Sequence, residues 1–256
     1  MSWSRQIYLK SPAELQIMRA AGRINAEVLA TVNELLKPGV STADLNAAAE
    51  EVLRKHGCKS PFKGYGRPPF PASITVSINQ ELVHGIPSKT RKLKTGDIVS
   101  IDCGTILDGF VADSAFTAGV GEISPEARTL LEVTKGALYA AIEKMRVGNR
   151  TGDVSAAIQK YVESRGFFVT REYTGHGVGR RMHEEPQVPN YGKAGTGIPL
   201  EPGMTIAIEP MVLGGTAETR VLPDRWTVVS ADGSLTAHFE HSIAVTEGDP
   251  LLLTVP

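Results

Sequence analysis

The sequence has few cysteines, almost no net charge and no long hydrophobic run. Cys58 and Cys103 are its two cysteines, too few for a disulfide framework and without the spacing of a zinc finger. Lysine and arginine number 27 against 28 aspartates and glutamates, so overall charge gives no reason to expect nucleic acid as a partner. The same balance argues against an anionic membrane surface.

No stretch of the chain approaches the length needed to span a bilayer, and residues 1–6 lack the apolar core of a signal peptide. We therefore expect a cytoplasmic protein without a membrane partner, in a compartment where two cysteines stay reduced. With 256 residues, 41% of them hydrophobic, the chain is long enough to bury a substantial core.

An internal repeat organises the chain. Ser11-Pro12-Ala13-Glu14 has the form of a capped helix start, and the pattern predicts a helix to about Leu36 and a second over residues 42–57. The same order recurs as a long helix over 124–147 and a shorter one over 151–166. At an offset of 109, six pairs are identical: Gly39/Gly148, Thr42/Thr151, Asp44/Asp153, Ala47/Ala156, Ala48/Ala157 and Gly57/Gly166.

The repeat continues into the predicted strands. His84-Gly85-Ile86 corresponds to His176-Gly177-Val178, and residues 96–102 correspond to 203–209, which places Asp102 and Glu209 at equivalent strand ends. A duplicated unit of two helices and two strands is expected to pack as one α+β domain, with both sheets facing a shared centre and the helices outside. We predict a single domain, 1–256, with halves of approximately 11–118 and 124–246.

Four acids stand in apolar, strand-like surroundings. Residues 98–102 and 205–209 are buried-looking strands that each end in a carboxylate, and no lysine or arginine lies on them. An unpaired buried carboxylate is costly, so a positive partner is required, and a divalent cation fits best. The candidate ligands are four carboxylates and one imidazole: Asp102, Asp113, His176, Glu209 and Glu240.

Asp108-Gly109 is a strong hairpin signal between two of these acids. If these two residues form the turn, Gly104 faces Asp113, and Asp102 lies on the same face as a diagonal neighbour of Asp113. We expect a comparable arrangement in the second half, where Asp232-Gly233 turns the chain before the strand that carries Glu240.

Ligation by carboxylates and one histidine suits Mn(II), Fe(II), Co(II) or Zn(II), and four carboxylates carry more charge than one ion needs. Two metal ions would neutralise the cluster and could generate hydroxide at neutral pH. The expected reaction class is therefore hydrolysis.

Glycine-rich surroundings single out three histidines: His84, His176 and His183. Glycine lets the backbone approach a ligand closely. For His56 and His238 we expect ordinary hydrogen-bonded or surface imidazoles, and His241 stays open.

With these residues assembled, nearly the whole chain resembles the short bacterial type I methionine aminopeptidases. The resemblance rests on the intervals of 18, 11, 63, 7, 26 and 31 residues that separate His84, Asp102, Asp113, His176, His183, Glu209 and Glu240. It implies the pita-bread fold and a dinuclear metal site. In that site Asp113 and Glu240 bridge both ions, Asp102 completes one, and His176 with Glu209 completes the other.

The resemblance also implies an activity: a bridging hydroxide attacks the first peptide bond of nascent proteins and removes methionine when the second residue is small. His84 would contact the scissile peptide group, His183 would stabilise the tetrahedral intermediate and Glu209 would relay protons. The methionine pocket is expected to be aromatic, with candidates Tyr65, Phe70 and Trp226, for which ordinary core packing is nearly as good an explanation.

The chain departs from the family at Val83, where many relatives have cysteine, and at Met182, where an aromatic residue is frequent. Both changes are apolar and should alter pocket shape, not chemistry. Because Ser2 is small, the implied substrate rule predicts that Met1 of this chain is itself removed. We expect a monomer that meets nascent N-termini near the ribosome exit.

Three alternatives share the fold. An Xaa-Pro peptidase uses the same metal cage but usually carries an extra N-terminal domain, and too few residues precede the first helix to build one. A non-catalytic binding module of the same fold would lose ligands, whereas this chain keeps all five and both flanking histidines. A type II methionine aminopeptidase would need a helical insertion between His183 and Glu209, where the interval is short.

Overall fold

A computed structural model describes residues 6–256, and the prediction about Met1 and Ser2 lies outside them. Within these residues there are four helices: α1 (Pro12–Glu34), α2 (Thr42–Lys55), α3 (Pro125–Ile142) and α4 (Thr151–Glu163). The strands are β1 (Ile74–Ile78), β2 (Glu81–Val83), β3 (Ile98–Leu107), β4 (Phe110–Gly119), β5 (Phe168–Val169), β6 (Thr174–Gly177), β7 (Glu184–Pro189), β8 (Thr205–Ile208), β9 (Met211–Leu213), β10 (Thr219–Val221), β11 (Val228–Ser230), β12 (Thr236–His238), β13 (Glu240–Ala244) and β14 (Leu251–Leu252).

The predicted capping residue starts helix α1. The hydroxyl of Ser11 accepts the backbone N–H of Glu14, whose carboxylate accepts the N–H of Ser11, a complete capping box for α1. Helix α3 ends at Ile142, five residues before the predicted end, because the chain tightens into i→i−3 hydrogen bonds there and turns Met145 into the core.

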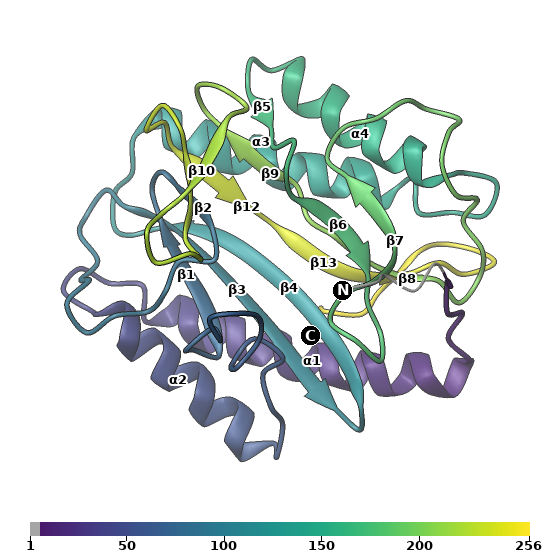
Figure 1. Cartoon of the computed structure of the whole chain (residues 1–256), viewed down its shortest axis with the longest axis horizontal. Coiled ribbons are helices and arrows are strands. Elements are labelled where there is room, and N and C mark those ends of the chain that lie inside the picture. The colour runs from purple at the N-terminus through teal and green to yellow at the C-terminus, as the bar shows by residue number, and fades with distance from the viewer. Residues whose placement is uncertain (1–5) are drawn as a thin grey trace.

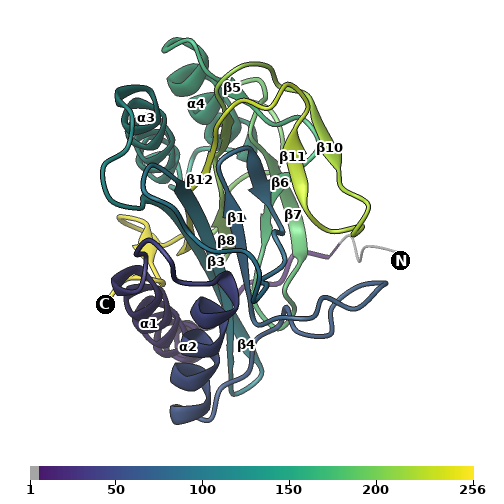
Figure 2. The same cartoon turned by 90° about the vertical axis from the view of Figure 1, so that its left-hand side faces the viewer.

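One curved antiparallel sheet runs through the molecule in the order β1-β3-β4-β13-β8-β6-β7, with β14 paired to β13. Helices α1 and α2 pack against β1 and β3 through one apolar cluster, and α3 and α4 pack against the strands of the second half through another. Both helix pairs cover the same face of the sheet (Figures 1 and 2). The predicted α+β architecture of two similar halves, with helices outside a shared sheet, is confirmed.

The Asp108-Gly109 hairpin is confirmed. Both turn residues have positive φ, 47° and 80°, as a two-residue type I′ turn requires, and Gly104 pairs with Asp113 as predicted. Asp232-Gly233 also turns the chain, but the flanking strands do not pair with each other, because β11 joins β2 and β10 while β12 joins β9. Glu209 and Glu240 therefore approach through the pairing of β8 with β13.

The two halves of the sheet meet where β4 and β13 run side by side. Only two residue pairs form this contact in the described chain, Glu240 with Ala115 and His241 with Ser114. The opposite side of the sheet from the helices carries the long loops and the three-stranded sheet β10-β11-β2 (Figure 2). Within the described residues no helix has the length and apolarity needed to cross a bilayer.

Candidate metal centre

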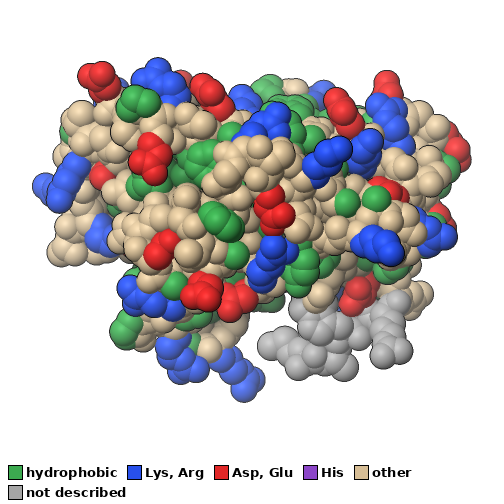
Figure 3. Space-filling model, turned by 90° about the horizontal axis from the view of Figure 1, so that it is seen from above, with side chains coloured by type: hydrophobic (Ala, Val, Ile, Leu, Met, Phe, Trp, Pro, Cys, Tyr) green, Lys and Arg blue, Asp and Glu red, His purple; other side chains and the backbone are tan. Residues whose placement is uncertain are grey.

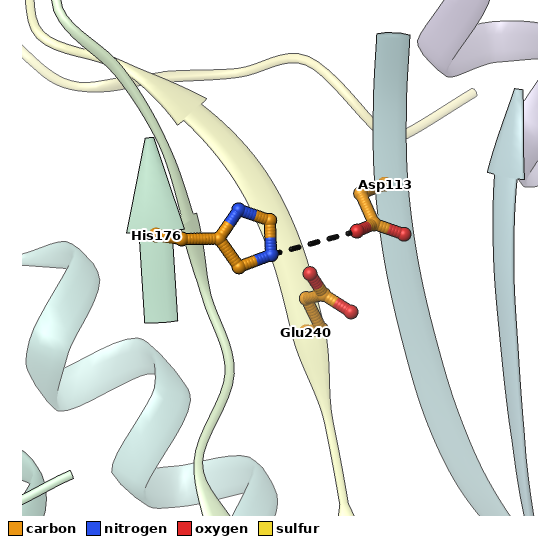
Figure 4. A group of neighbouring side chains, drawn as sticks. All are labelled: Asp113, His176 and Glu240. Atoms are coloured by element: carbon orange, nitrogen blue, oxygen red, sulfur yellow. Dashed lines mark ion pairs between the residues drawn. The ribbon is translucent and has the colours of Figure 1, made fainter. Parts of the chain in front are cut away.

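The five predicted ligands come together across the seam between the halves. Asp102 and Asp113 come from β3 and β4, His176 from β6, Glu240 from β13, and Glu209 directly follows β8. All five line one cavity of about 140 Å³. Asp113, His176 and Glu240 can place one ligand atom each within 4.8 Å of one another, and Figure 4 shows their side chains converging.

His176 is oriented to offer a lone pair to this cavity. Its Nδ1 donates to the backbone carbonyl of Gly177 at 2.9 Å, which leaves Nε2 free of a proton in the neutral ring. Nε2 lies 3.5 Å from Glu209 and 3.9 Å from Asp113, the contact dashed in Figure 4. Burial lowers the pKa of His176 to about 3, so the imidazole is neutral at physiological pH, as a metal ligand must be.

The carboxylates are strongly perturbed. Burial raises the pKa of Asp102 to about 7, and burial with mutual repulsion raises the pKa values of Asp113 and Glu240 well above the ordinary range. Burial alone raises the pKa of Glu209 in the same direction. No lysine or arginine pairs with these acids among residues 6–256, so the protein alone does not neutralise them.

Three buried carboxylate oxygens have no hydrogen-bond partner: Asp102 Oδ1, Asp113 Oδ1 and Glu240 Oε1. Buried acceptors are almost always satisfied, and oxygens left open beside a neutral imidazole are the donor set of a divalent metal. The residues therefore fit a metal site.

The expectation for His238 is wrong. Its side chain is 2% exposed, and its Nε2 lies 3.6 Å from Glu209 and 3.7 Å from Glu240, without a hydrogen-bond partner. The sequence held a signal for this: His238 and Glu240 are two residues apart in an extended chain, which puts them on one face. His56, by contrast, is the predicted surface imidazole, 2.8 Å from Glu27. His241 bonds to Thr254 at 2.8 Å and lines a different cavity, next to α3.

His84 sits in a strained backbone conformation. Its φ is 62°, in the left-handed region, and the next residue is a glycine whose Cβ, if present, would lie 2.2 Å from the carbonyl oxygen of Val76. This backbone directs the imidazole into the cavity, where burial lowers its pKa to about 4. Non-glycine residues in this conformation concentrate at functional sites.

His183 reaches the cavity from the loop between β6 and β7. Its ring lies 4.4 Å from that of His176, and its Nδ1 is 2.9 Å from the hydroxyl of Tyr65. Burial lowers the pKa of His183, which favours the neutral ring. If the tyrosine hydroxyl donates, Nε2 carries the proton and can donate to a substrate oxygen.

Replacing Tyr65 by phenylalanine should therefore lower kcat roughly tenfold and leave KM within about twofold, because the ring stays while the bond that fixes the tautomer is lost. Steady-state cleavage of the peptide substrate that the resemblance implies measures both constants. Tyr139→Phe, a partly exposed tyrosine on α3, is the matched control. An unchanged kcat would mean that Tyr65 is only a wall of the cavity.

The three aromatic candidates line the cavity together. Phe70 meets Trp226 edge to face at 5.2 Å, and the indole N–H of Trp226 donates to the carbonyl of Pro68 at 3.1 Å. Tyr65 stands at the rim, 44% exposed. Sequence reasoning did not single out Phe62 and Thr75, which also line it, and Met182 completes the apolar side.

The perturbed acids predict a pH effect on stability. A carboxyl whose folded pKa is raised keeps its proton in the folded state, so folding stability falls as pH rises through that pKa, here about 7 for Asp102. Buried neutral histidines act oppositely, but only below about pH 6.5. Metal-free protein should thus lose roughly 1.4 kcal/mol per pH unit for each such proton as the pH rises from about 6.5 to the folded pKa of the group, which is about 7 for Asp102.

Thermal melts in EDTA and in Mn²⁺ across this range measure the effect. We expect the melting temperature to fall with pH in EDTA and to hold in Mn²⁺, because the ion neutralises the acids once they deprotonate. A melting temperature in EDTA that is constant or rises with pH would contradict the perturbed carboxyl cluster.

Comparison with known proteins identifies the class. A model described as metallopeptidase family M24 matches residues 16–247, and the chain belongs to this family. It is a hydrolase that depends on a divalent metal. Within the family it is 50% identical to a methionine aminopeptidase of Clostridium acetobutylicum over 249 residues, 97% of this chain and 99% of that one.

Solved structures agree. The methionine aminopeptidase of Thermotoga maritima superposes with a TM-score of 0.96 at 45% identity, over 98% of this chain and 100% of that one. The resemblance to methionine aminopeptidases and the pita-bread fold are thereby confirmed. An Xaa-Pro dipeptidase from Bacillus anthracis shares the fold with a TM-score of 0.77 at 23% identity, and this chain covers 62% of it.

Proposed function

We propose that this protein is a metal-dependent methionyl aminopeptidase, which removes the N-terminal methionine from nascent proteins when the second residue is small. The proposal rests on two features of one cavity. Carboxylate oxygens without hydrogen-bond partners form a cage on one side, and Tyr65, Phe70 and Trp226 form an aromatic wall. An apolar wall beside a metal cage suits an uncharged, flexible side chain such as methionine.

Two divalent ions, among Mn, Fe, Co and Zn, would occupy the cage. Asp113 and Glu240 would bridge them, with Asp102 completing one and His176 and Glu209 the other. Such ions supply Lewis acidity and hydroxide at neutral pH. The number of carboxylates supports two ions, because a single one would leave excess negative charge buried.

Side chains of the protein would bind the substrate and transfer protons. Asp102 would stand nearest the substrate's free amino group, and His84 would hold the scissile peptide group. His183 would donate a hydrogen bond to the oxygen on which negative charge develops, a role that its neutral ring and its contact with Tyr65 support. Glu209 would carry protons towards the leaving amine, consistent with a raised carboxyl pKa.

The biological setting follows from the substrate. We propose a monomeric, cytoplasmic enzyme of one catalytic domain, residues 1–256, that meets nascent N-termini near the ribosome exit. Two free, buried cysteines support a reducing compartment. The side chains on the face in Figure 3 are of both signs and interspersed, in keeping with no nucleic-acid partner for that face.

A panel of three peptides tests the function. Mn²⁺-loaded protein and its Asp102→Ala variant are given Met-Ala-Ser, Met-Lys-Ser and Ala-Pro-Ala, and free amino acids are quantified. We expect wild-type protein to cleave Met-Ala-Ser only, and the variant to cleave none. Preference for Ala-Pro-Ala would move the assignment to an Xaa-Pro peptidase, and absence of metal-dependent cleavage would favour a binding module.

A further inference from the structure

The contact between β4 and β13 is short, and it is extended at both ends by side chains. Two backbone pairs form its centre, Glu240 with Ala115 and His241 with Ser114. Continuing that register, Ser242 stands opposite Asp113 and His238 stands opposite Thr117. At these two positions a hydroxyl takes over the hydrogen bonds that the facing backbone would make.

The first hydroxyl belongs to Ser242. Its Oγ accepts the backbone N–H of Asp113 at 2.9 Å and donates to the carbonyl of the same residue at 2.8 Å. The backbone of Ser242 is satisfied elsewhere: its N–H donates to Thr254 and its carbonyl accepts the N–H of Leu253. The hydroxyl oxygen of Ser242 therefore lies between strands β4 and β13 and spaces them apart. Ser242 and Asp113 are both buried.

The second hydroxyl is the counterpart from the other half. Thr117 Oγ1 accepts the backbone N–H of His238 at 2.9 Å and donates to its carbonyl at 2.8 Å. Ser100 on β3 lies 2.8 Å from the same oxygen and ties it to the neighbouring strand. Each half thus contributes one hydroxyl that holds both backbone groups of a residue in the other.

One hydroxyl holds the backbone of Asp113 itself, and the other holds His238, two residues from Glu240. Asp113 lies on β4 and Glu240 on β13, so the separation of the two strands sets the separation of the two carboxylates. In a closed backbone ladder the strands would approach more closely at both ends. A metal cage tolerates little error in ligand position, which makes this separation a functional quantity.

We propose that Ser242 and Thr117 are positioning residues of the metal centre, whose hydroxyls hold β4 and β13 at the spacing that Asp113 and Glu240 need to bind metal. The inference rests on the metal centre proposed above. Ser242 has the larger part, because it holds the backbone of a ligand directly, whereas Thr117 holds His238, two residues from Glu240.

Calorimetric titration of metal-free protein with Mn²⁺ tests this without using activity. Ser242→Ala should weaken Mn²⁺ binding about 10- to 100-fold, the range found when partners of metal ligands are removed. Thr117→Val should weaken it less, and Ser242→Thr, which restores a hydroxyl, should bind close to wild type. The amide proton of Asp113 should also exchange faster in metal-free Ser242→Ala.

A matched control separates positioning from simple stabilisation. Thr134 is fully buried, its hydroxyl donates to the carbonyl of Leu130 within α3, and it does not line the cavity of the candidate metal site. Thr134→Val should lower the urea midpoint and leave the Mn²⁺ affinity unchanged. Ser242→Ala protein that is equally destabilised but binds Mn²⁺ like wild type would overturn the proposal.

If Ser242→Ala does not fold, Ser242→Cys takes its place, since a thiol has a similar shape but is a weak donor and acceptor. Binding weaker than that of Ser242→Thr supports the proposal, and equal binding overturns it. Wild-type protein that binds no Mn²⁺ would instead remove the metal centre itself and, with it, the proposed function.

Discussion

Asp113→Asn is expected to abolish metal-dependent cleavage while leaving the fold intact. The substitution keeps the shape of a side chain that is 2% exposed but removes the charge through which Asp113 would bind both ions. Metal ions supply several kcal/mol of transition-state stabilisation, which corresponds to a loss of on the order of 1000-fold or more in kcat/KM.

Stability should move in the opposite direction. In metal-free protein burial, together with repulsion from neighbouring carboxylates, raises the pKa of Asp113, so replacing this residue by a neutral amide removes a buried charge and relieves the repulsion. At pH 8 in EDTA the variant should be at least as stable as wild type in urea, and Mn²⁺ should no longer raise its midpoint. A variant that loses activity but keeps its stability in EDTA has lost a metal ligand, whereas a variant that loses both has lost its fold.

Asp108→Asn provides the control for the same chemical change in the same hairpin. Asp108 is exposed in the turn with φ of 47°, a conformation that asparagine accepts readily. Its activity and Mn²⁺ binding should match wild type. Cleavage by Asp113→Asn within tenfold of wild type would take Asp113 out of the ligand set.

Lys10→Met should produce the largest loss of stability. Lys10 Nζ lies 2.5 Å from Glu184, and each side chain is only 4% exposed. Removing one partner of a buried ion pair leaves an uncompensated charge, which costs about 3 to 5 kcal/mol. Urea denaturation measured by circular dichroism gives the free energy of unfolding directly.

The effect should extend to catalysis, because Glu184 follows His183 and also accepts the backbone N–H of Arg181 at 3.1 Å. The variant should therefore lose activity even where it is folded.

Lys10→Met combined with Glu184→Leu removes both charges and should recover most of the stability. Arg54→Met breaks an exposed pair with Glu51 and should change stability by less than about 1 kcal/mol. A loss of stability in Arg54→Met as large as that in Lys10→Met would contradict the idea that burial makes the Lys10–Glu184 pair important.

The sequence was most informative where local rules apply. Ser11 and Glu14 specify a helix start by themselves, and Asp108-Gly109 specifies both the turn and the register that sets Asp113 opposite Gly104. The convergence of the candidate ligands could be predicted because acids on buried strands conflict with their surroundings. The roles of these residues in catalysis stay predictions until the variants are measured.

What the sequence did not reveal depends on contacts between distant segments. Ser242 and Asp113 are 129 positions apart, and nothing in either neighbourhood marks a serine as a spacer between strands. The pairing of β11 with β2 was not predicted either, because these strands are far apart in the sequence and the turn at residues 232–233 suggested a local hairpin instead. His238 was wrongly predicted to be an ordinary imidazole, because a lone histidine most often is one.

The left-handed backbone at His84 sets folding stability against the catalytic role proposed for its imidazole. Glycine would adopt this conformation without the roughly 1 to 3 kcal/mol that a side chain costs there, so selection for thermal stability alone would remove the imidazole. Engineering that ranks substitutions by folding energy would favour glycine or asparagine at this position and yield a more stable protein without the imidazole proposed to hold the scissile peptide group. Position 84 should therefore be held fixed in any attempt to stabilise this enzyme.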